Sequence, residues 1–318
     1  MFNHRLASVL ILVFCFCSVA KGQSPGAAQD AYNRGRQRYL KGDLDRSIAD
    51  FTAAIELSSR PQEASRSGHK KWKAESAFIA ANPDANRITI VDPLTAAAYV
   101  GRALARHYQG DLEGALADND SAIAIDPGLT EAYNNRGSTR FALRDLDGAL
   151  ADFDKAIEID PLYADPYNNR ANVRVARGDY EAGLADFDQA IALNPRRAEI
   201  FSNRGHVRRD KGDLEGALAD AERAIKLNSR LADAFHLRGT LRFHKQDLQR
   251  AVADFNHAIE LNPRLAQAYG NRGFVRLLQG QDAIAEEDFA QCIKLDPGSK
   301  PRLDQWIETV KQSRKIAR

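Results

Sequence analysis

Small and large apolar residues recur along the chain with a period of 34 residues, between Ala28 and Ser299. In each copy the eighth and twentieth residues are small, the fourth is mostly aromatic, the twenty-fourth is often Phe and the twenty-eighth is always Ile. Small residues let two helices approach closely, and the large ones fill the space beside them. The pattern therefore predicts paired helices. The seven copies begin at Ala28, Ala96, Thr130, Ala164, Ala198, Ala232 and Ala266.

Turn residues divide each copy into two helices. Gly-Asp pairs occur at 42–43, 110–111, 178–179 and 212–213. Glycine tolerates the positive φ that follows many helices, and aspartate accepts hydrogen bonds from the free amides of the next helix. Asp-Pro or Asn-Pro, as at Asp126-Pro127, then closes the repeat.

This 34-residue pattern resembles the tetratricopeptide repeat. The resemblance implies an all-α, right-handed superhelical solenoid of antiparallel helix pairs with a C-terminal capping helix. We expect repeats one to seven at 28–61, 96–129, 130–163, 164–197, 198–231, 232–265 and 266–299, with a capping helix and basic tail at 300–318. The cap is predicted because Leu303, Trp306, Ile307 and Val310 form one apolar stripe at helical spacing.

Residues 62–95 interrupt the series, and their length equals one repeat. The segment is either a degenerate repeat or an insert with a short helix near 71–81 and an extended stretch at 87–91. Its Lys70–Lys73 cluster, which contains Trp72, is either an ordinary exposed loop or a contact with a partner or a membrane surface.

The N-terminal residues resemble a secretory signal peptide. Arg5 precedes an uncharged stretch from Leu6 to Ala20, which is shorter than the roughly 20 residues of a spanning helix. We expect residues 1–22 to be a signal peptide that is cleaved after Ala20 or Gly22. The mature protein is then periplasmic or secreted. An uncleaved membrane anchor is the alternative, and only in that case do we expect membrane contact.

Arginine and aspartate also follow the repeat. Positions 7 and 11 are Arg and position 23 is Asp in all seven copies. Arginines four residues apart share one face of the first helix. We predict that each Asp contacts one or both arginines of its own repeat, as Asp186 would contact Arg170 or Arg174. The other interpretation is an anion-binding stripe on the surface.

The resemblance implies that positions 2, 5, 6, 9, 12 and 13 of the first helices line a concave face. A row of asparagines would lie there, similar to the asparagine ladder of the O-GlcNAc transferase superhelix, and amides can hold a peptide backbone. Alternatively, Asn is merely common in this repeat. We expect aromatic anchors at position 12. The candidate peptide-binding residues are Asn33, Asn134, Asn135, Asn168, Asn169, Asn203, Asn271, Tyr39, Phe141 and Phe243.

Charge and missing motifs limit the possible functions. The formal net charge is +2, so we expect no nucleic-acid partner. Positions 2 and 5 contain no Lys or Arg, which argues against a clamp for a terminal carboxylate. No phosphate loop, serine elbow or zinc spacing occurs, and we expect no catalytic residue, metal or cofactor and no direct small-molecule substrate. The sequence indicates a non-catalytic scaffold for proteins or peptides, or alternatively a regulatory or targeting subunit of an envelope enzyme complex.

Overall fold

The computed structural model describes residues 26–59 and 93–316, and every regular element in these ranges is a helix. This confirms the expected all-α fold class. The chain divides after Asn169 into two compact units. The predicted signal peptide, the greater part of the 62–95 segment and the last residues of the basic tail lie outside the described residues.

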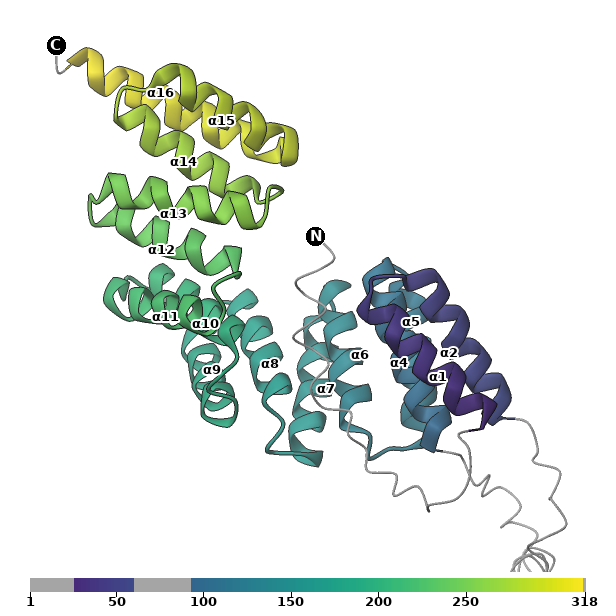
Figure 1. The fold of residues 1–318 in the computed structure, drawn as a ribbon. Helices are drawn as coiled ribbons and strands as arrows, with labels where there is room; N and C mark the ends of the chain where they lie inside the picture. Colours follow the sequence, from purple (N-terminus) through teal and green to yellow (C-terminus); the bar gives the residue numbers. More distant parts are fainter. Residues whose placement is uncertain (1–25, 60–92, 317–318) are drawn as a thin grey trace, which may run out of the picture. The chain divides into compact units, whose positions relative to one another are not determined.

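The unit that ends at Asn169 is built from successive helix pairs (Figure 1). It contains α1 (Ala27–Leu40), α2 (Leu44–Ser58), α4 (Pro93–Gln109), α5 (Leu112–Ile125), α6 (Thr130–Ala142) and α7 (Leu146–Ile159), and α8 (Ala164–Ala176) crosses the division. Within this unit α1 packs on α2, α4 on α5 and α6 on α7.

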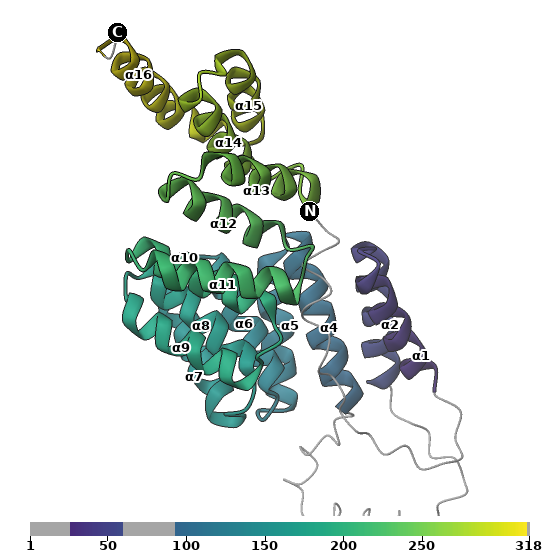
Figure 2. The same ribbon diagram turned by 60° about the vertical axis from the view of Figure 1, so that its left-hand side comes forward.

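The second unit repeats this arrangement. It contains α9 (Tyr180–Leu193), α10 (Ala198–Asp210), α11 (Leu214–Leu227), α12 (Ala232–His244), α13 (Leu248–Leu261), α14 (Ala266–Leu278), α15 (Asp282–Leu295), a 3-10 turn η2 (Pro297–Ser299) and α16 (Lys300–Ile316). Figure 2 shows the pairs α12–α13 and α14–α15 stacked in order, and α16 contacts α14.

The predicted aspartate caps form at Asp111, Asp179 and Asp213, whereas Asp43 makes no side-chain hydrogen bond to α2. Asp145 caps α7 by accepting a hydrogen bond of 2.9 Å from the amide of Gly148. Gly110 follows α4 with a φ of 97°, in the left-handed region that favours glycine. Two repeats instead place Arg144 and Gln246 there, with φ of 66° and 62°. The turn is therefore kept at these two positions at some conformational cost.

Close approach of the two helices of a pair explains the small eighth residue. A Cβ atom on Gly137 would lie 2.8 Å from the ring of Phe153, and one on Gly273 would lie 2.8 Å from the ring of Phe289. Both rings are buried. The glycine at position 8 therefore leaves room for the ring at position 24, and this contact lies in the core of both repeats.

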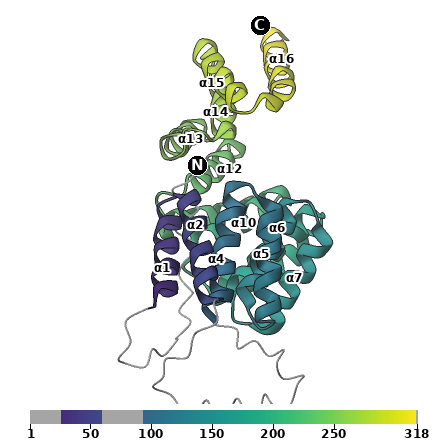
Figure 3. The same ribbon diagram turned by 90° about the vertical axis from the view of Figure 1, so that its right-hand side faces the viewer.

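Helices α2 and α4, which flank the undescribed segment 60–92, pack directly on each other (Figure 3). The hydroxyl of Thr95 donates to that of Ser58 at 2.7 Å, and Arg102 Nη1 donates to Thr52 Oγ1 at 3.0 Å. A Cβ on Gly101 would lie 2.6 Å from the ring of Phe51. Repeats one and two are therefore in direct contact. The expected short helix near 71–81 and the extended stretch at 87–91 lie outside the described residues.

The capping helix α16 presents the expected apolar stripe. Leu303 and Val310 are buried, while Trp306 and Ile307 are half-buried against the same cluster as Phe289. This confirms the predicted stripe. Among the described helices, none has both the length and the apolar character that crossing a membrane requires.

Candidate peptide-binding surface

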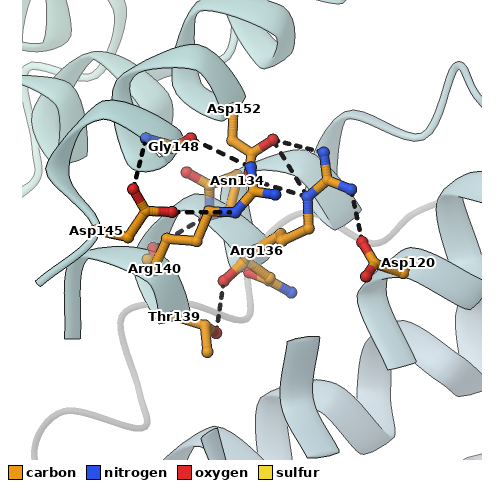
Figure 4. Close-up of polar contacts among 10 residues, drawn as sticks. Asp120, Asn134, Arg136, Thr139, Arg140, Asp145, Gly148 and Asp152 are labelled. Atoms are coloured by element: carbon orange, nitrogen blue, oxygen red, sulfur yellow. Dashed lines mark hydrogen bonds and ion pairs between the residues drawn. The ribbon is translucent and has the colours of Figure 1, made fainter. Parts of the chain in front are cut away.

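Arginine and aspartate form an internal ladder within the repeats, as Figure 4 shows for the third. Arg136 Nη2 lies 2.6 Å from Asp152 Oδ1, and Arg140 Nη1 lies 2.7 Å from Asp152 Oδ2. The position-23 aspartates, which are buried, pair with both arginines in every repeat: Asp50, Asp118, Asp152, Asp186, Asp220, Asp254 and Asp288. The predicted ladder is confirmed, and these aspartates are therefore not available to a ligand.

The position-7 arginine also joins neighbouring repeats, which the period of the sequence did not predict. Arg136 Nη1 donates to Asp120 of the preceding repeat at 2.6 Å, and the Arg136 guanidinium lies 5.4 Å from the centre of the Tyr133 ring. Burial opposes the charge, but the hydrogen bonds to Asp152 and Asp120 raise the pKa of Arg136. One feature of the sequence could have indicated this contact between repeats. Position 25 is acidic in four successive copies, at Asp120, Asp154, Asp188 and Glu222.

Two asparagines at position 6 bond to the preceding first helix. Asn169 Nδ2 donates to Asn134 Oδ1 at 2.9 Å, and Asn168 Nδ2 donates to Asn169 Oδ1 at 3.1 Å. Asn271 Nδ2 lies 2.9 Å from His236 Nε2 and 3.3 Å from Thr240 Oγ1. The side-chain amides of Asn169 and Asn271 therefore stabilise the contact between neighbouring repeats.

The other predicted asparagines differ in accessibility. Asn134 and Asn168 are buried, with 4% and 6% of their surface exposed, and so they offer a ligand little surface. Asn33 is exposed and accepts a hydrogen bond from Gln29, while Asn135 and Asn203 are half-buried. Among the described residues, no side chain bonds to the Asn135 amide. Asn135 is therefore the best placed of the row to contact a peptide.

The position-12 aromatics do not share one environment. Tyr39 is buried against Leu44 and Ala105, so the expectation of a solvent-facing anchor is wrong there. Its ring lies 6.0 Å from that of Tyr108 in the next repeat, and burial raises the pKa of its hydroxyl. Phe141 and Phe243 are half-buried and remain candidates.

An aromatic row continues from Phe243 to the cap. The rings of Phe243 and Phe274 meet edge to face with centres 5.7 Å apart, and those of Phe274 and Trp306 lie 5.1 Å apart. These residues come from α12, α14 and α16, so the row runs across two first helices and the capping helix of one unit.

A polar network joins α10 and α12. Ser202 Oγ and His206 Nε2 lie 2.6 Å and 3.0 Å from Asp233 Oδ2, and Arg209 Nη1 lies 3.1 Å from His206 Nδ1. Burial alone would raise the pKa of Asp233, but the contacts with His206 and Ser202 lower it. Burial lowers the pKa of His236 to about 4, so this ring is neutral at pH 7.

A cavity of about 220 Å³ opens on the inner positions of repeats five to seven. Its walls include Arg209 from α10, His236 from α12, Asn271 from α14, and Arg302, Leu303 and Trp306 from α16. Position 12 of repeat five and the cap thus supply positive charge that positions 2 and 5 lack.

No group of three or more His, Cys, Asp or Glu side chains in residues 26–59 and 93–316 could hold a metal ion. Cys292 is buried, and its sulfur lies 3.5 Å from Ser299 Oγ. The thiol is part of the core beneath α16.

Sequence profiles described as tetratricopeptide repeat match residues 76–130, 130–163, 168–232, 232–265 and 266–299, which is more than half of the chain. The chain belongs to the tetratricopeptide repeat family. Tetratricopeptide repeat proteins are generally non-catalytic scaffolds for protein interactions. The match that begins at residue 76 includes part of the 62–95 segment.

Several solved structures share the fold. A tetratricopeptide repeat protein of Parabacteroides merdae is 18% identical, with 90% of this chain and 99% of that chain covered and a TM-score of 0.58. PilF of Pseudomonas aeruginosa is 19% identical, with 69% of this chain and 97% of that chain covered and a TM-score of 0.59. A chain of the APC/C hetero-tetramer Cut9–Hcn1 is 13% identical, with 92% of this chain and 72% of that chain covered and a TM-score of 0.62. No curated protein matches the chain.

Proposed function

We propose that this tetratricopeptide repeat protein binds peptide segments or helices of partner proteins along the inner faces of its first helices. The observation that carries the proposal is the cavity on the inner positions of repeats five to seven, beside the row Phe243, Phe274 and Trp306. Aromatic side chains next to a pocket provide large contact areas for a ligand.

The second-helix side gives less support for binding. Its position-23 aspartates are buried and paired, so they offer no free charge. On the first helices, by contrast, Asn135 and Phe141 are half-buried and occupy positions 6 and 12, where we expect the ligand-binding face. A side-chain amide offers both a donor and an acceptor, so it can bind a peptide backbone without strict sequence selection.

A phage-displayed library of random 12-residue peptides, selected against the purified full chain, tests the proposal. Selected peptides should bind with an affinity that falls at least about tenfold in Asn135→Ala/Phe141→Ala or in Phe243→Ala, since truncating an anchor typically costs about 1–2 kcal/mol or more. Glu222→Ala, an exposed change on α11, is the matched control. Enrichment of no peptide, or equal binding by all variants, contradicts the proposal.

We also propose that the protein is exported, because residues 1–22 have the pattern of a signal peptide. After expression in a bacterium, the protein recovered from the periplasm should begin at Lys21 or Gln23. Its N-terminal sequence and its mass measure this. A chain that keeps Met1 and stays in the cytoplasm contradicts export without affecting the binding proposal.

A further inference from the structure

The cavity between α10, α12, α14 and α16 has the size of a side-chain pocket. Its volume of about 220 Å³ is below the roughly 300–1,000 Å³ of pockets that enclose drug-sized ligands or cofactors. It therefore fits one or two side chains of a bound peptide. Trp306 and Leu303 provide its apolar wall, and Gly270 leaves room on α14.

The charged side chains in the cavity wall are basic. Arg302 and Arg209 both line it, and no Asp or Glu does. Arg302 is exposed and stacks on Trp306 with its guanidinium carbon 5.3 Å from the ring centre. Among the described residues, no carboxylate pairs with Arg302. Its five donors are therefore available to an incoming anion.

Arg209 is held in place by its neighbours. Its Nε and Nη2 donate to Asp210 Oδ1 at 2.9 Å and 2.7 Å, and its Nη1 lies 3.1 Å from His206 Nδ1. These contacts fix the guanidinium of Arg209 at the cavity wall. The other polar side chains of the wall carry no charge at pH 7: His236 and Asn271 bond to each other, and Gln267 is an amide.

We propose that this cavity binds a carboxylate of a peptide ligand, which Arg302 engages with support from Arg209 while the adjoining carbon chain packs on Trp306. The inference rests on the proposed peptide binding and makes the capping helix part of the recognition surface. A carboxylate accepts two parallel hydrogen bonds from a guanidinium, and a neutral amide of the same shape does not.

Small probes with one carboxylate each test the site and its source. N-acetylglutamate α-amide presents a side-chain carboxylate, and N-acetylglutamine α-amide is its neutral isostere. N-acetylleucine presents a chain-end carboxylate, and N-acetylleucine amide is its control. Binding is followed by the ¹⁵N–¹H indole signal of Trp306 in the full chain. Trp72 is the one other tryptophan in the sequence, and Trp72→Phe identifies its signal.

We expect at least one acid to bind about fivefold or more tightly than its neutral partner, and the pair that shows this identifies the source. Arg302→Gln should abolish that difference and Arg302→Lys should reduce it, because lysine keeps the charge but not the planar fork. The matched control is Arg264→Gln, an exposed arginine in the turn before α14 that does not line the cavity.

Equal responses to acid and amide, or an unchanged difference in Arg302→Gln, overturn the inference. A stronger Trp306 response to inorganic phosphate than to either acid also overturns it. These results are separable from the library selection. Selected peptides that bind Arg302→Gln as tightly as the original chain leave the proposed function standing, whereas acids that bind when no peptide is selected contradict the proposed function alone.

Discussion

At the residue scale, position 24 of one repeat and position 6 of the next share a space. Most repeats place Phe at position 24 and Asn at position 6. Repeat five has Ala221 in place of Phe, and repeat six has Leu237 in place of Asn. Both are fully buried in one cluster, and Leu237 Cδ2 would lie 2.8 Å from a Cβ on Gly205. The leucine thus fills the volume that a ring occupies elsewhere.

This exchange predicts strong coupling between the two residues. Ala221→Phe alone should overpack the site and destabilise the chain by about 1–3 kcal/mol. Leu237→Asn alone should cost more, since it removes buried apolar volume and buries an amide. The double substitution restores the common Phe–Asn pair. Its loss of stability should be smaller than the sum of the two single losses by at least about 1 kcal/mol. Urea unfolding of the four proteins measures this, and strictly additive effects would contradict the shared space.

Protonation of His236 should make stability depend on pH. Its pKa is about 4 in the folded chain, against an ordinary value of 6.5 for histidine, so the unfolded state takes up the proton first as pH falls. The free energy of unfolding should therefore be unaffected by this group above pH 6.5 and decrease by roughly 3 kcal/mol toward pH 4. The lowered pKa of Asp233 removes further stability below that range.

Urea unfolding at pH 7.5, 6, 5 and 4 measures the effect. His236→Gln keeps an acceptor for Asn271 and should flatten the dependence between pH 6.5 and 4. His244→Gln, at an exposed position, should leave it as it is. Parallel curves for the original chain and His236→Gln would show that His236 is not responsible.

At the element scale, the Arg–Asp ladder joins the two helices of a pair. Asp152 has 3% of its side chain exposed and accepts from Arg136 and Arg140, of which 16% and 28% are exposed. Asp152→Asn removes the buried anion that Arg136 and Arg140 share, and leaves them only the more exposed Asp120 and Asp145. We expect a loss of about 2–4 kcal/mol, which is less than for a fully buried pair because water reaches the arginines.

Asp120 provides a matched control on the same guanidinium. It pairs with Arg136 at 2.6 Å, but 58% of its side chain is exposed. Asp120→Asn should cost less than about 1 kcal/mol. Urea midpoints of the two variants decide the matter. Equal losses would mean that burial of the aspartate does not determine the energy of a rung.

How far the sequence predicts these elements depends on what each one needs. The helix pairs and the Asp152 rungs require only the phase of residues within one repeat, and the period supplies it. The burial of Tyr39 is not predicted, because it depends on contact with Tyr108 of the next repeat. In the sequence these two residues are separated by the segment 60–92. Asn169 was open to two interpretations, since the period does not say whether an amide faces a ligand or Asn134.

The cavity beside α16 cannot be predicted from the sequence, for a related reason. Trp306 stands where the repeats have their position-7 arginine, yet its ring lies 5.1 Å from that of Phe274, on the aromatic row. The orientation of α16 follows from its packing on α14 and not from the 34-residue period. The charges of Arg209 and Arg302 are therefore brought together by tertiary packing alone.

At the scale of the whole molecule, stability in a repeat protein passes between neighbours, because each repeat buries its apolar surface only against the next. Leu303 of α16 is 1% exposed and belongs to one cluster with Leu277 of α14 and Phe289 of α15. The cap should therefore protect the last pair most strongly and more distant pairs progressively less.

Hydrogen exchange of the full chain measures this spread. Leu303→Ala, which removes about 2–5 kcal/mol of burial and packing, should accelerate amide exchange most in α14 and α15 and least in α10 and α11. Ile284→Ala, on α15 but 46% exposed, is the control and should change little. Equal acceleration from α10 to α15 would indicate that the unit unfolds as one cooperative body, since a nearest-neighbour array transmits only part of a local loss to each successive pair.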